Sequence, residues 1–462
     1  MERNQKNDFT QGAVWKVILR MAVPMMLAQT VNVLYNIVDR MYIGHMPGSG
    51  SLALTGLGLC MPIISIITAF ASLCGVGGGP LCSIARGRGD LRYAERVMGN
   101  ALAMLLGIGL TLTVLLRIFM RPVLYAMGAS EVTYPFASEY AKIYILGTVF
   151  VMIAHGMNYF INAQGFARTG MLTVAIGAAL NILLDPLFIF VLDMGITGAA
   201  LATVLSQAVS AGWAMAFLLS SRAILDLKPE NLRLEWGIVK RILALGATGF
   251  VMSVTNGIVQ IAYNIQLRAW GGDLYVGAMT VVNSVREVVF MGCTGLRDGA
   301  QPVLGYNYGA GVYSRVKQCI RFVSGFSIIY SAVAWALILL LAEPIVRIFN
   351  NEPALVAAAV PAMRVHFCGL VFMSMMMAGQ SVFLSLGKSR QAITFSILRK
   401  VVIVTPLIFL LPRIANWGVM GVFWAEPISD IIGGGASFLT MIFTVYLRLG
   451  EDRPARKQGE TL

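Results

Sequence analysis

Long apolar runs separated by short polar connections dominate the chain. Twelve of these runs extend over about 20 residues or more, the length that a helix needs to cross the hydrocarbon core of a bilayer. They fall at 14–38, 54–79, 97–119, 139–162, 170–192, 197–219, 241–266, 274–296, 320–341, 362–385, 392–411 and 419–446. Because the runs are continuously apolar, they predict membrane-spanning helices and exclude a β-barrel.

Glycine and proline positions recur along the chain at a constant spacing. An offset of 222 residues superimposes Pro80 on Pro302, Gly87 on Gly309, Gly89 on Gly311, Pro122 on Pro344, Gly147 on Gly369 and Gly165 on Gly387. An offset of 223 then superimposes Gly195 on Gly418, Gly198 on Gly421, Ala202 on Ala425 and Ser206 on Ser429. Because glycine and proline fix backbone geometry, this recurrence predicts two similar halves.

The runs and the repeat together predict an all-α polytopic membrane protein. We expect 12 transmembrane helices in two pseudo-symmetric six-helix lobes around a central cleft, and an even number of spans per half makes the repeats parallel. The predicted parts are an N-terminal lobe at 1–221, a cytoplasmic linker at 222–238, a C-terminal lobe at 239–447 and a basic tail at 448–462. This plan is common among transporters that work by rocking.

Composition supports the membrane assignment. Hydrophobic residues make up 57% of the chain and charged residues 12%, and the mean hydropathy is +0.75. An ordinary water-soluble domain does not carry so little charge. The six cysteines form no CxxC pair, so the sequence predicts neither a disulfide framework nor a zinc site, and we expect no cofactor.

The net charge of +13 is distributed unevenly. Lys and Arg concentrate in every second connection, namely Arg3 and Lys6; Arg86, Arg88, Arg92 and Arg96; Arg168; Arg222, Lys228, Arg233, Lys240 and Arg241; Arg315, Lys317 and Arg321; Lys388 and Arg390; and Arg448, Arg453, Arg456 and Lys457. The positive-inside rule therefore predicts that both termini lie on the cytoplasmic side of the membrane. We expect this membrane to be a bacterial-type plasma (inner) membrane. The charge indicates orientation and contact with membrane lipids, and we expect no nucleic-acid partner.

Polar residues inside the apolar runs are the candidates for function. Asp185 lies in the middle of a span, where an ionised carboxylate costs roughly 2.5 to 3.5 kcal/mol on insertion scales. Asn181 lies four residues earlier on the same helix face, and Pro186 leaves the carbonyl of Ile182 free. Such a group can hold a proton, a sodium ion or an ordered water. The alternative is a hydrogen-bonded plug that fixes helix packing.

Asp39 lies near the outer end of the first span. It either belongs to the same site as Asp185 or pairs locally with Arg40. In the C-terminal half, the positions that the repeat aligns with Asp39 and Asp185 fall around Ile261 and at Thr405–Leu407. Neither position carries a carboxylate.

The C-terminal half carries its own charged residues inside spans. Arg286 and Glu287 are adjacent and point in different directions, so each needs its own partner. Glu426 and Asp430 share a helix face at the start of the last span, which favours a structural role over ion coupling.

Several stretches resemble the multidrug and toxic compound extrusion (MATE) family over nearly the whole chain. They are YNIVDRMYIG at 35–44 with LALTGL at 52–57, NILLDP at 181–186, QPVLGYNYGAG at 301–311 and WAEPISD at 424–430. Within that family the chain is most similar to the DinF-like branch. This resemblance implies ion coupling through Asp39, Asn181, Asp185 and Thr203, which would also be the metal ligands if Na⁺ is the coupling ion.

A second branch of the family, the NorM-like branch, uses an acidic residue in the seventh helix. The present chain has only Asn256, Gln260 and Asn264 there, which favours coupling through the N-terminal lobe.

The resemblance implies a monomeric antiporter, driven by H⁺ or Na⁺, that exports small organic and often cationic compounds by alternating access. Our candidates for its substrate cavity are Tyr35, Asn36, Arg286, Glu287 and Met376. Met376 belongs to a methionine cluster whose flexible side chains suit varied substrates, although packing or lipid contact is the more usual role of any single methionine.

Two other classes of function remain. A flippase for lipid-linked sugars or a related lipid intermediate would need a strongly cationic cavity, and Arg286 and Arg297 leave that open. An integral membrane enzyme is less supported, because no nucleophile motif or histidine cluster is evident, and no phosphate loop indicates ATP-driven transport.

Overall fold

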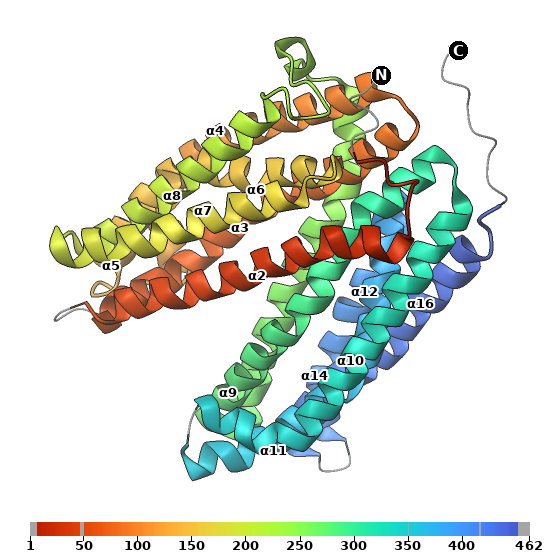
Figure 1. Ribbon diagram of the computed structural model, residues 1–462. Helices are drawn as coiled ribbons and strands as arrows, with labels where there is room; N and C mark the ends of the chain where they lie inside the picture. The colour runs from red at the N-terminus through yellow and green to blue at the C-terminus, as the bar shows by residue number, and fades with distance from the viewer. Residues whose placement is uncertain (1–6, 47–49, 350, 415–416, 451–462) are drawn as a thin grey trace. The chain divides into compact units, whose positions relative to one another are not determined.

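The computed structural model describes residues 7–46, 50–349, 351–414 and 417–450, and every regular element among them is helical (Figure 1). The N-terminal half contains α2 (Val14–Gly44), α3 (Gly50–Gly87), α4 (Leu91–Ala126), α5 (Tyr134–Leu146), α6 (Thr148–Ala163), α7 (Ala167–Pro186), η1 (Leu187–Val191), α8 (Gly195–Leu218) and η2 (Pro229–Leu232). The second half contains α9 (Trp236–Ala310), α10 (Tyr313–Phe349), α11 (Pro353–His366), η3 (Phe367–Gly369), α12 (Leu370–Ser385), α13 (Ser389–Ile397), η4 (Leu398–Val404), α14 (Thr405–Leu410), η5 (Leu411–Arg413), α15 (Gly418–Ser429), η6 (Asp430–Gly434), α16 (Gly435–Met441) and η7 (Ile442–Tyr446).

The described helices confirm the predicted membrane fold. Eleven helical stretches are long and apolar enough to cross a bilayer, or up to 12 if the bent pair α5 and α6 forms one span. A break at Gly272 divides α9 into two of these stretches, and the consecutive elements α7–η1, α11–α12, α13–η5 and α15–η7 each form one. The bent pair replaces the straight span expected at 139–162, because the chain bends by 57° at Gly147. A Cβ atom at Gly147 would lie 2.6 Å from Val204 Cγ2, so the glycine at the bend lets α8 pack closely.

The predicted repeat appears in the backbone. Three pairs of glycines that the two sequence offsets align have matching positive φ angles, a conformation that strongly favours glycine. These pairs are Gly89 (80°) with Gly311 (77°), Gly165 (88°) with Gly387 (75°), and Gly195 (57°) with Gly418 (52°). The connections at these points therefore turn in the same way in both halves.

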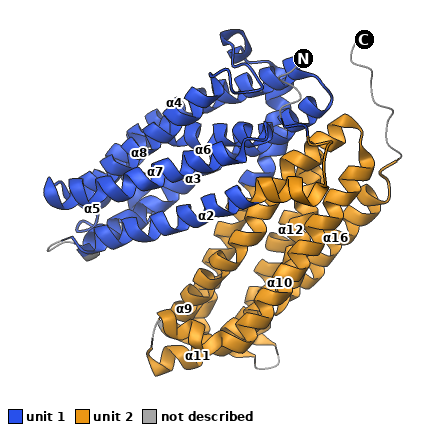
Figure 2. Cartoon of the chain, viewed as in Figure 1, with its two compact units in different colours: residues 1–8, 23–250 blue, residues 9–22, 251–462 orange. Residues whose placement is uncertain are grey.

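The chain groups into two compact units, drawn in blue and orange in Figure 2. Unit 1 comprises residues 1–8 and 23–250, and unit 2 comprises residues 9–22 and 251–462. The first turns of α2 thus belong to unit 2, while the first turns of α9 belong to unit 1. Each unit has its own hydrophobic core.

The segment expected as the linker, 222–238, packs on unit 1. The Gln164 side-chain oxygen accepts hydrogen bonds from the backbone of Ile224 and Leu225 at 2.8 and 3.0 Å. The Asn100 side-chain oxygen accepts one from the Glu235 backbone at 2.7 Å. The division of the chain into lobes at this segment stays a prediction, and residues 451–462 of the expected basic tail lie outside the described residues, as do Arg3 and Lys6.

Candidate functional site

The four predicted coupling residues come together inside unit 1. Asp39 on α2 is 6% exposed, and Asp185 at the end of α7 is fully buried. The Asn181 amide donates hydrogen bonds to Asp185 Oδ1 at 3.2 Å and to Thr203 Oγ1 at 3.3 Å. The two carboxyl groups are close enough to share a side-chain hydrogen bond. Three helices, α2, α7 and α8, therefore supply one polar network.

Several oxygen atoms of this network lack a partner. Asp39 Oδ1, Asp185 Oδ2 and Asn181 Oδ1 are buried and accept no hydrogen bond from any described residue. Neither carboxylate forms an ion pair within the described chain, and the neighbouring Arg40 side chain is exposed. Buried carboxylates without a compensating charge are costly. The arrangement is therefore suited to accept a proton or a small cation between its oxygens.

Tyrosines surround the carboxylates. Tyr140 and Tyr144 on α5 are buried and stack with ring centroids 5.9 Å apart, and the Tyr140 side chain lies close to that of Thr203. Tyr35 on α2 is close enough to interact electrostatically with both Asp39 and Asp185. Tyr35 was among the residues predicted from the sequence, whereas the α5 pair was not, although its four-residue spacing on one helix face was an available signal.

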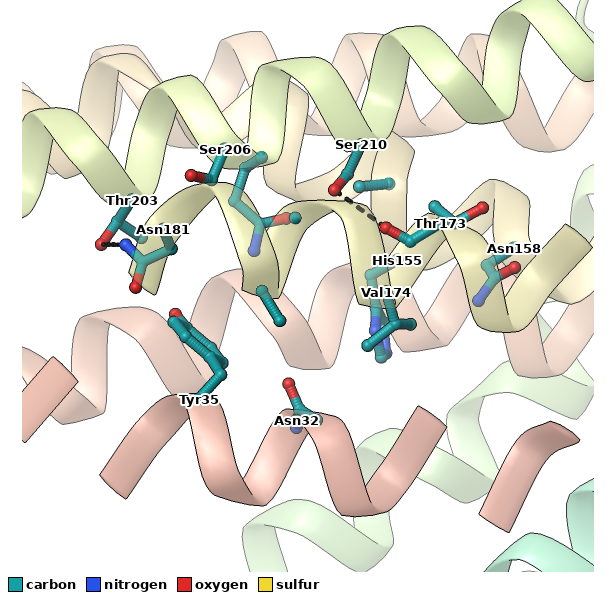
Figure 3. A pocket seen from close by; sticks show the side chains of 14 residues that line it. Asn32, Tyr35, His155, Asn158, Thr173, Val174, Asn181, Thr203, Ser206 and Ser210 are labelled. Atoms are coloured by element: carbon teal, nitrogen blue, oxygen red, sulfur yellow. Dashed lines mark hydrogen bonds between the residues drawn. The ribbon is translucent and has the colours of Figure 1, made fainter. Parts of the chain in front are cut away.

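A cavity of about 100 Å³ begins at this network. Figure 3 shows Asn181 and Thr203 at one end of it and Asn158 at the other. Its lining comprises Asn32, Tyr35, Ala154, His155, Asn158, Thr173, Val174, Gly177, Ala178, Asn181, Thr203, Ser206, Gln207 and Ser210. Pockets for drug-sized ligands are roughly 300–1,000 Å³. This cavity therefore suits an ion and a few water molecules better than an organic substrate.

The cavity extends the polar network along α7 and α8. Ser210 donates a hydrogen bond to the Thr173 backbone oxygen at 3.0 Å. Ser206 Oγ and Asn158 Oδ1 are buried without a partner among the described residues. The serines and Thr203 recur at intervals of three and four residues along α8, a spacing that the sequence analysis did not use.

The residues predicted for the substrate cavity are divided between the units. Tyr35 lines the polar cavity, and Asn36 hydrogen-bonds the backbone of Asn32 within its own helix at 2.7 Å. In unit 2, Met376 is buried and Glu287 is exposed. The half-buried Arg286 lies in the same unit, over the Phe290 ring at 5.8 Å. Their shared role in one substrate cavity stays a prediction.

Unit 2 contains a different charged cluster. The Arg399 guanidinium donates to Glu426 at 2.9 Å and to Asp430 at 2.5 Å, and Tyr263 donates to Glu426 at 3.4 Å. The two acidic residues are thus paired, in keeping with the structural role favoured from the sequence. Arg399 and its neighbour Lys400 were not among the residues predicted for a role, although two basic residues inside an apolar run were a usable signal.

Comparisons with known proteins agree with the sequence and the fold. The MatE family model matches residues 24–187 and 244–410, more than half of the chain. Multidrug export protein MepA of Staphylococcus haemolyticus is 26% identical over 450 residues, which cover 97% of each chain. MepA of Staphylococcus saprophyticus is 25% identical over 464 residues, covering 99% of this chain and 100% of the relative.

Solved structures match along the whole fold. A crystal structure of MATE in the bent conformation has a TM-score of 0.90 at 24% identity and covers 97% of this chain and 98% of its own. An outward-facing multidrug resistance MATE family transporter of the MOP superfamily has a TM-score of 0.88 at 23% identity, covering 95% and 97%. These structures confirm the membrane fold that the sequence predicts, and the family model confirms the family resemblance.

Proposed function

The chain belongs to the MatE family of transporters, and we propose that it is a secondary antiporter that exports organic, often cationic, compounds. Its driving force is a gradient of H⁺, Na⁺ or both. The observation that carries this proposal is the buried pair Asp39 and Asp185, whose free oxygens have no cationic partner among the described residues. The names of the relatives, which are multidrug export proteins, support an organic substrate.

The coupling site follows from the chemistry of this network. Asn181 and Thr203 fix the orientation of Asp185, because the Thr203 hydroxyl donates to the Ala199 backbone at 3.0 Å and accepts from the Asn181 amide. A proton or a sodium ion between the carboxylates relieves their repulsion. Loading from the outside then rearranges unit 1 and weakens substrate binding, and unloading toward the cytoplasm resets it. The DinF-like assignment belongs to this proposal.

The organic substrate binds elsewhere than in the polar cavity, which is too small for it. We assign it to a central cleft between two six-helix lobes, lined by Tyr35, Asn36, Arg286, Glu287 and Met376. Rocking of the lobes opens the cleft alternately to each side. The proposed protein is a monomer in the plasma membrane, in contact with its lipids and with both termini in the cytoplasm.

The flippase alternative is not favoured. Arg297, one of the two arginines that left it open, forms an ion pair with Asp298 at 2.8 Å. The relatives named above are export proteins.

Transport into liposomes tests the proposal. The purified full-length protein is reconstituted, and the movement of ethidium is followed by fluorescence under a pH gradient alone and a Na⁺ gradient alone. We expect transport against the ethidium gradient with at least one of them, and its loss when nigericin or monensin, respectively, dissipates that gradient. Transport that is insensitive to both gradients would refute ion coupling.

A further inference from the structure

The last helical turn of unit 2 is contacted by two cations from other parts of that unit. Arg321 on α10 donates a hydrogen bond from Nε to the Tyr446 hydroxyl at 2.6 Å, and its guanidinium lies over the Tyr446 ring at 5.7 Å. Lys388, in the connection between α12 and α13, donates to the Thr444 backbone oxygen at 3.3 Å. A third cation, Arg448, follows Tyr446 by two residues. These contacts gather three cations around the turn that ends η7.

No carboxylate of the described chain balances these charges. None of the three side chains forms an ion pair with a described Asp or Glu. Partial burial and the charge of Arg448 both lower the pKa of Lys388, so these two cations lie close enough to repel each other. Arg321 and Arg448 are exposed, and Lys388 is half-buried. An anion at this place would relieve the repulsion, and it can reach the cations from the surface of the unit.

The donors that remain suit a phosphate group. Among the described residues, Arg321 donates only from Nε and Lys388 makes only one hydrogen bond, so most of their hydrogens are available. Tyr446 accepts from Arg321 and can still donate its own hydroxyl hydrogen. A guanidinium binds two phosphate oxygens in parallel, and an ammonium adds a point charge beside them.

An apolar face continues from the same turn along the last helix. Leu439, Phe443 and Leu447 are all more than half exposed. They recur every four residues, so they lie close to one side of α16 and η7. A ligand that uses both the cations and this face has a phosphate group joined to a hydrocarbon chain. A free phosphate ion would leave the apolar face unused.

We propose that Arg321, Lys388, Tyr446 and Arg448 form a binding site for the headgroup of an anionic phospholipid. The phosphate lies among the cations, and an acyl chain lies along the apolar face of the last helix. Basic residues at the cytoplasmic ends of membrane helices attract anionic lipids, and tyrosine favours the level of the headgroups. The distribution of charge in the sequence predicts that this end of the helix is cytoplasmic. The site is independent of ion coupling and of the exported compound.

The experiment uses the purified full-length protein in a neutral detergent and measures the Tm at increasing mole fractions of phosphatidylglycerol. Phosphatidylcholine with the same acyl chains, which has a phosphate but no net charge, is the matched probe. We expect phosphatidylglycerol to raise the Tm in a saturable way, because a ligand that binds only the folded state stabilises it, and phosphatidylcholine to raise it less. Arg321→Gln and Lys388→Gln should each increase the half-saturating mole fraction about fivefold, the effect of one basic side chain beside an anionic lipid.

Two further variants separate this site from general attraction between anionic lipid and a chain of net charge +13. Lys388→Arg keeps the positive charge and should keep the response. Arg92→Gln removes an exposed cation near the start of α4 in unit 1, on the side that is also predicted to be cytoplasmic, and should not alter the response. Each variant is compared with itself without lipid, so a change in stability does not obscure binding. Unchanged half-saturation in both Gln variants would overturn the site, as would an equal weakening in Arg92→Gln or equal responses to the two lipids.

Two other anions are tested as occupants. An equal rise in Tm with sodium phosphate alone would overturn the lipid assignment. Glu451 and Asp452 follow Arg448 in the sequence, and the double variant Glu451→Gln with Asp452→Asn should leave the response to phosphatidylglycerol unchanged. If phosphatidylglycerol stabilised only this double variant, carboxylates of the chain itself would occupy the site, and the proposal would be overturned.

Discussion

Matching places in the two units hold opposite chemistry. Gly177 and Thr203 border the polar cavity of unit 1. The offsets of 222 and 223 residues carry them onto Arg399 and Glu426, which form an ion pair in unit 2. Gln207, another cavity residue, corresponds to Asp430, the second carboxylate that Arg399 binds. Equivalent positions of the repeated fold thus border a cavity in unit 1 and form an ionic network in unit 2.

A reciprocal exchange of side-chain size explains the difference. In unit 1, a Cβ atom at Gly177 would lie 2.3 Å from Ser210 Oγ. In unit 2 the position of Ser210 is Gly433, and a Cβ atom there would lie 2.9 Å from Arg399 Cγ. Each helix pair therefore has one glycine that makes room for the partner's side chain. The backbone repeat tolerates both solutions, and in the proposed function this choice of side chain is what leaves room for a cation in unit 1.

The comparison is tested most strongly by Asp185→Asn, which should abolish gradient-driven export. The amide keeps the shape of the side chain but cannot exchange a proton or supply a negative charge. Removing an uncompensated charge should leave the fold stable. The measurement is pH- or Na⁺-driven transport of ethidium in everted membrane vesicles, normalised to the amount of protein.

Asp193→Asn is the matched control, because Asp193 lies just beyond the same helix in a positive-φ conformation that Asn tolerates. It should transport normally. A well-expressed Asp185→Asn protein with undiminished coupled export would remove unit 1 as the coupling site.

In unit 2 we expect a substitution at the matching position to lower the stability of the fold. Arg399→Met leaves Glu426 and Asp430 buried without their ion-pair partner, and removing one partner of a buried ion pair costs about 3–5 kcal/mol. The free energy of unfolding in detergent measures this loss. The triple variant that adds Glu426→Gln and Asp430→Asn should recover part of it, because neither carboxylate is then left without its ion-pair partner.

Arg413→Met, an exposed change at the end of the same span, should change the free energy of unfolding little. If Arg399→Met were no less stable than this control, the pairing in unit 2 would not be structural.

Filling the cavity of unit 1 with a larger side chain should have the next largest effect on stability and transport. Gly177→Leu places a side chain where unit 2 has Arg399, and it must displace the Ser210 hydroxyl. Overpacking of this kind costs about 1–3 kcal/mol, and we expect coupled export to fall because the ion and water lose their space. Unfolding and vesicle transport report the two effects separately.

Gly212→Leu on α8 is the control, since a Cβ atom there meets nothing within 4 Å. It should keep both stability and transport. Normal transport by a stable Gly177→Leu protein would show that the cavity is not needed for coupling.

The sequence predicted the parts of this comparison that depend on local spacing. The glycine repeat and the four-residue interval between Asn181 and Asp185 are visible without a structure, because each is set by backbone geometry. The pairing of Arg399 with Glu426 and Asp430 is not, because the partners come from different helices. Arg399 and Lys400 are visible as two basic residues inside an apolar run, but nothing in that run indicates which residues pair with them.

The cavity escaped prediction for a related reason. It exists because Gly177 is small opposite Ser210, and only the packing of α7 against α8 brings these two positions together. The bend at Gly147 was missed because the apolar run continues through it without a polar break.

The smallest effect is expected for Thr203→Val, which preserves the shape of the side chain and removes its hydroxyl. Asn181 then loses one acceptor and the Ala199 carbonyl loses a donor. The net value of such a hydrogen bond is about 0.5–1.5 kcal/mol, so we expect a loss of that size in the free energy of unfolding and weaker, though not abolished, coupled export. Thr111→Val is the control, because the exposed Thr111 hydroxyl only bonds the backbone of its own helix at 2.8 Å. Equal behaviour of the two variants would mean that Thr203 is one more helix-bonded threonine and that Asn181 orients Asp185 without it.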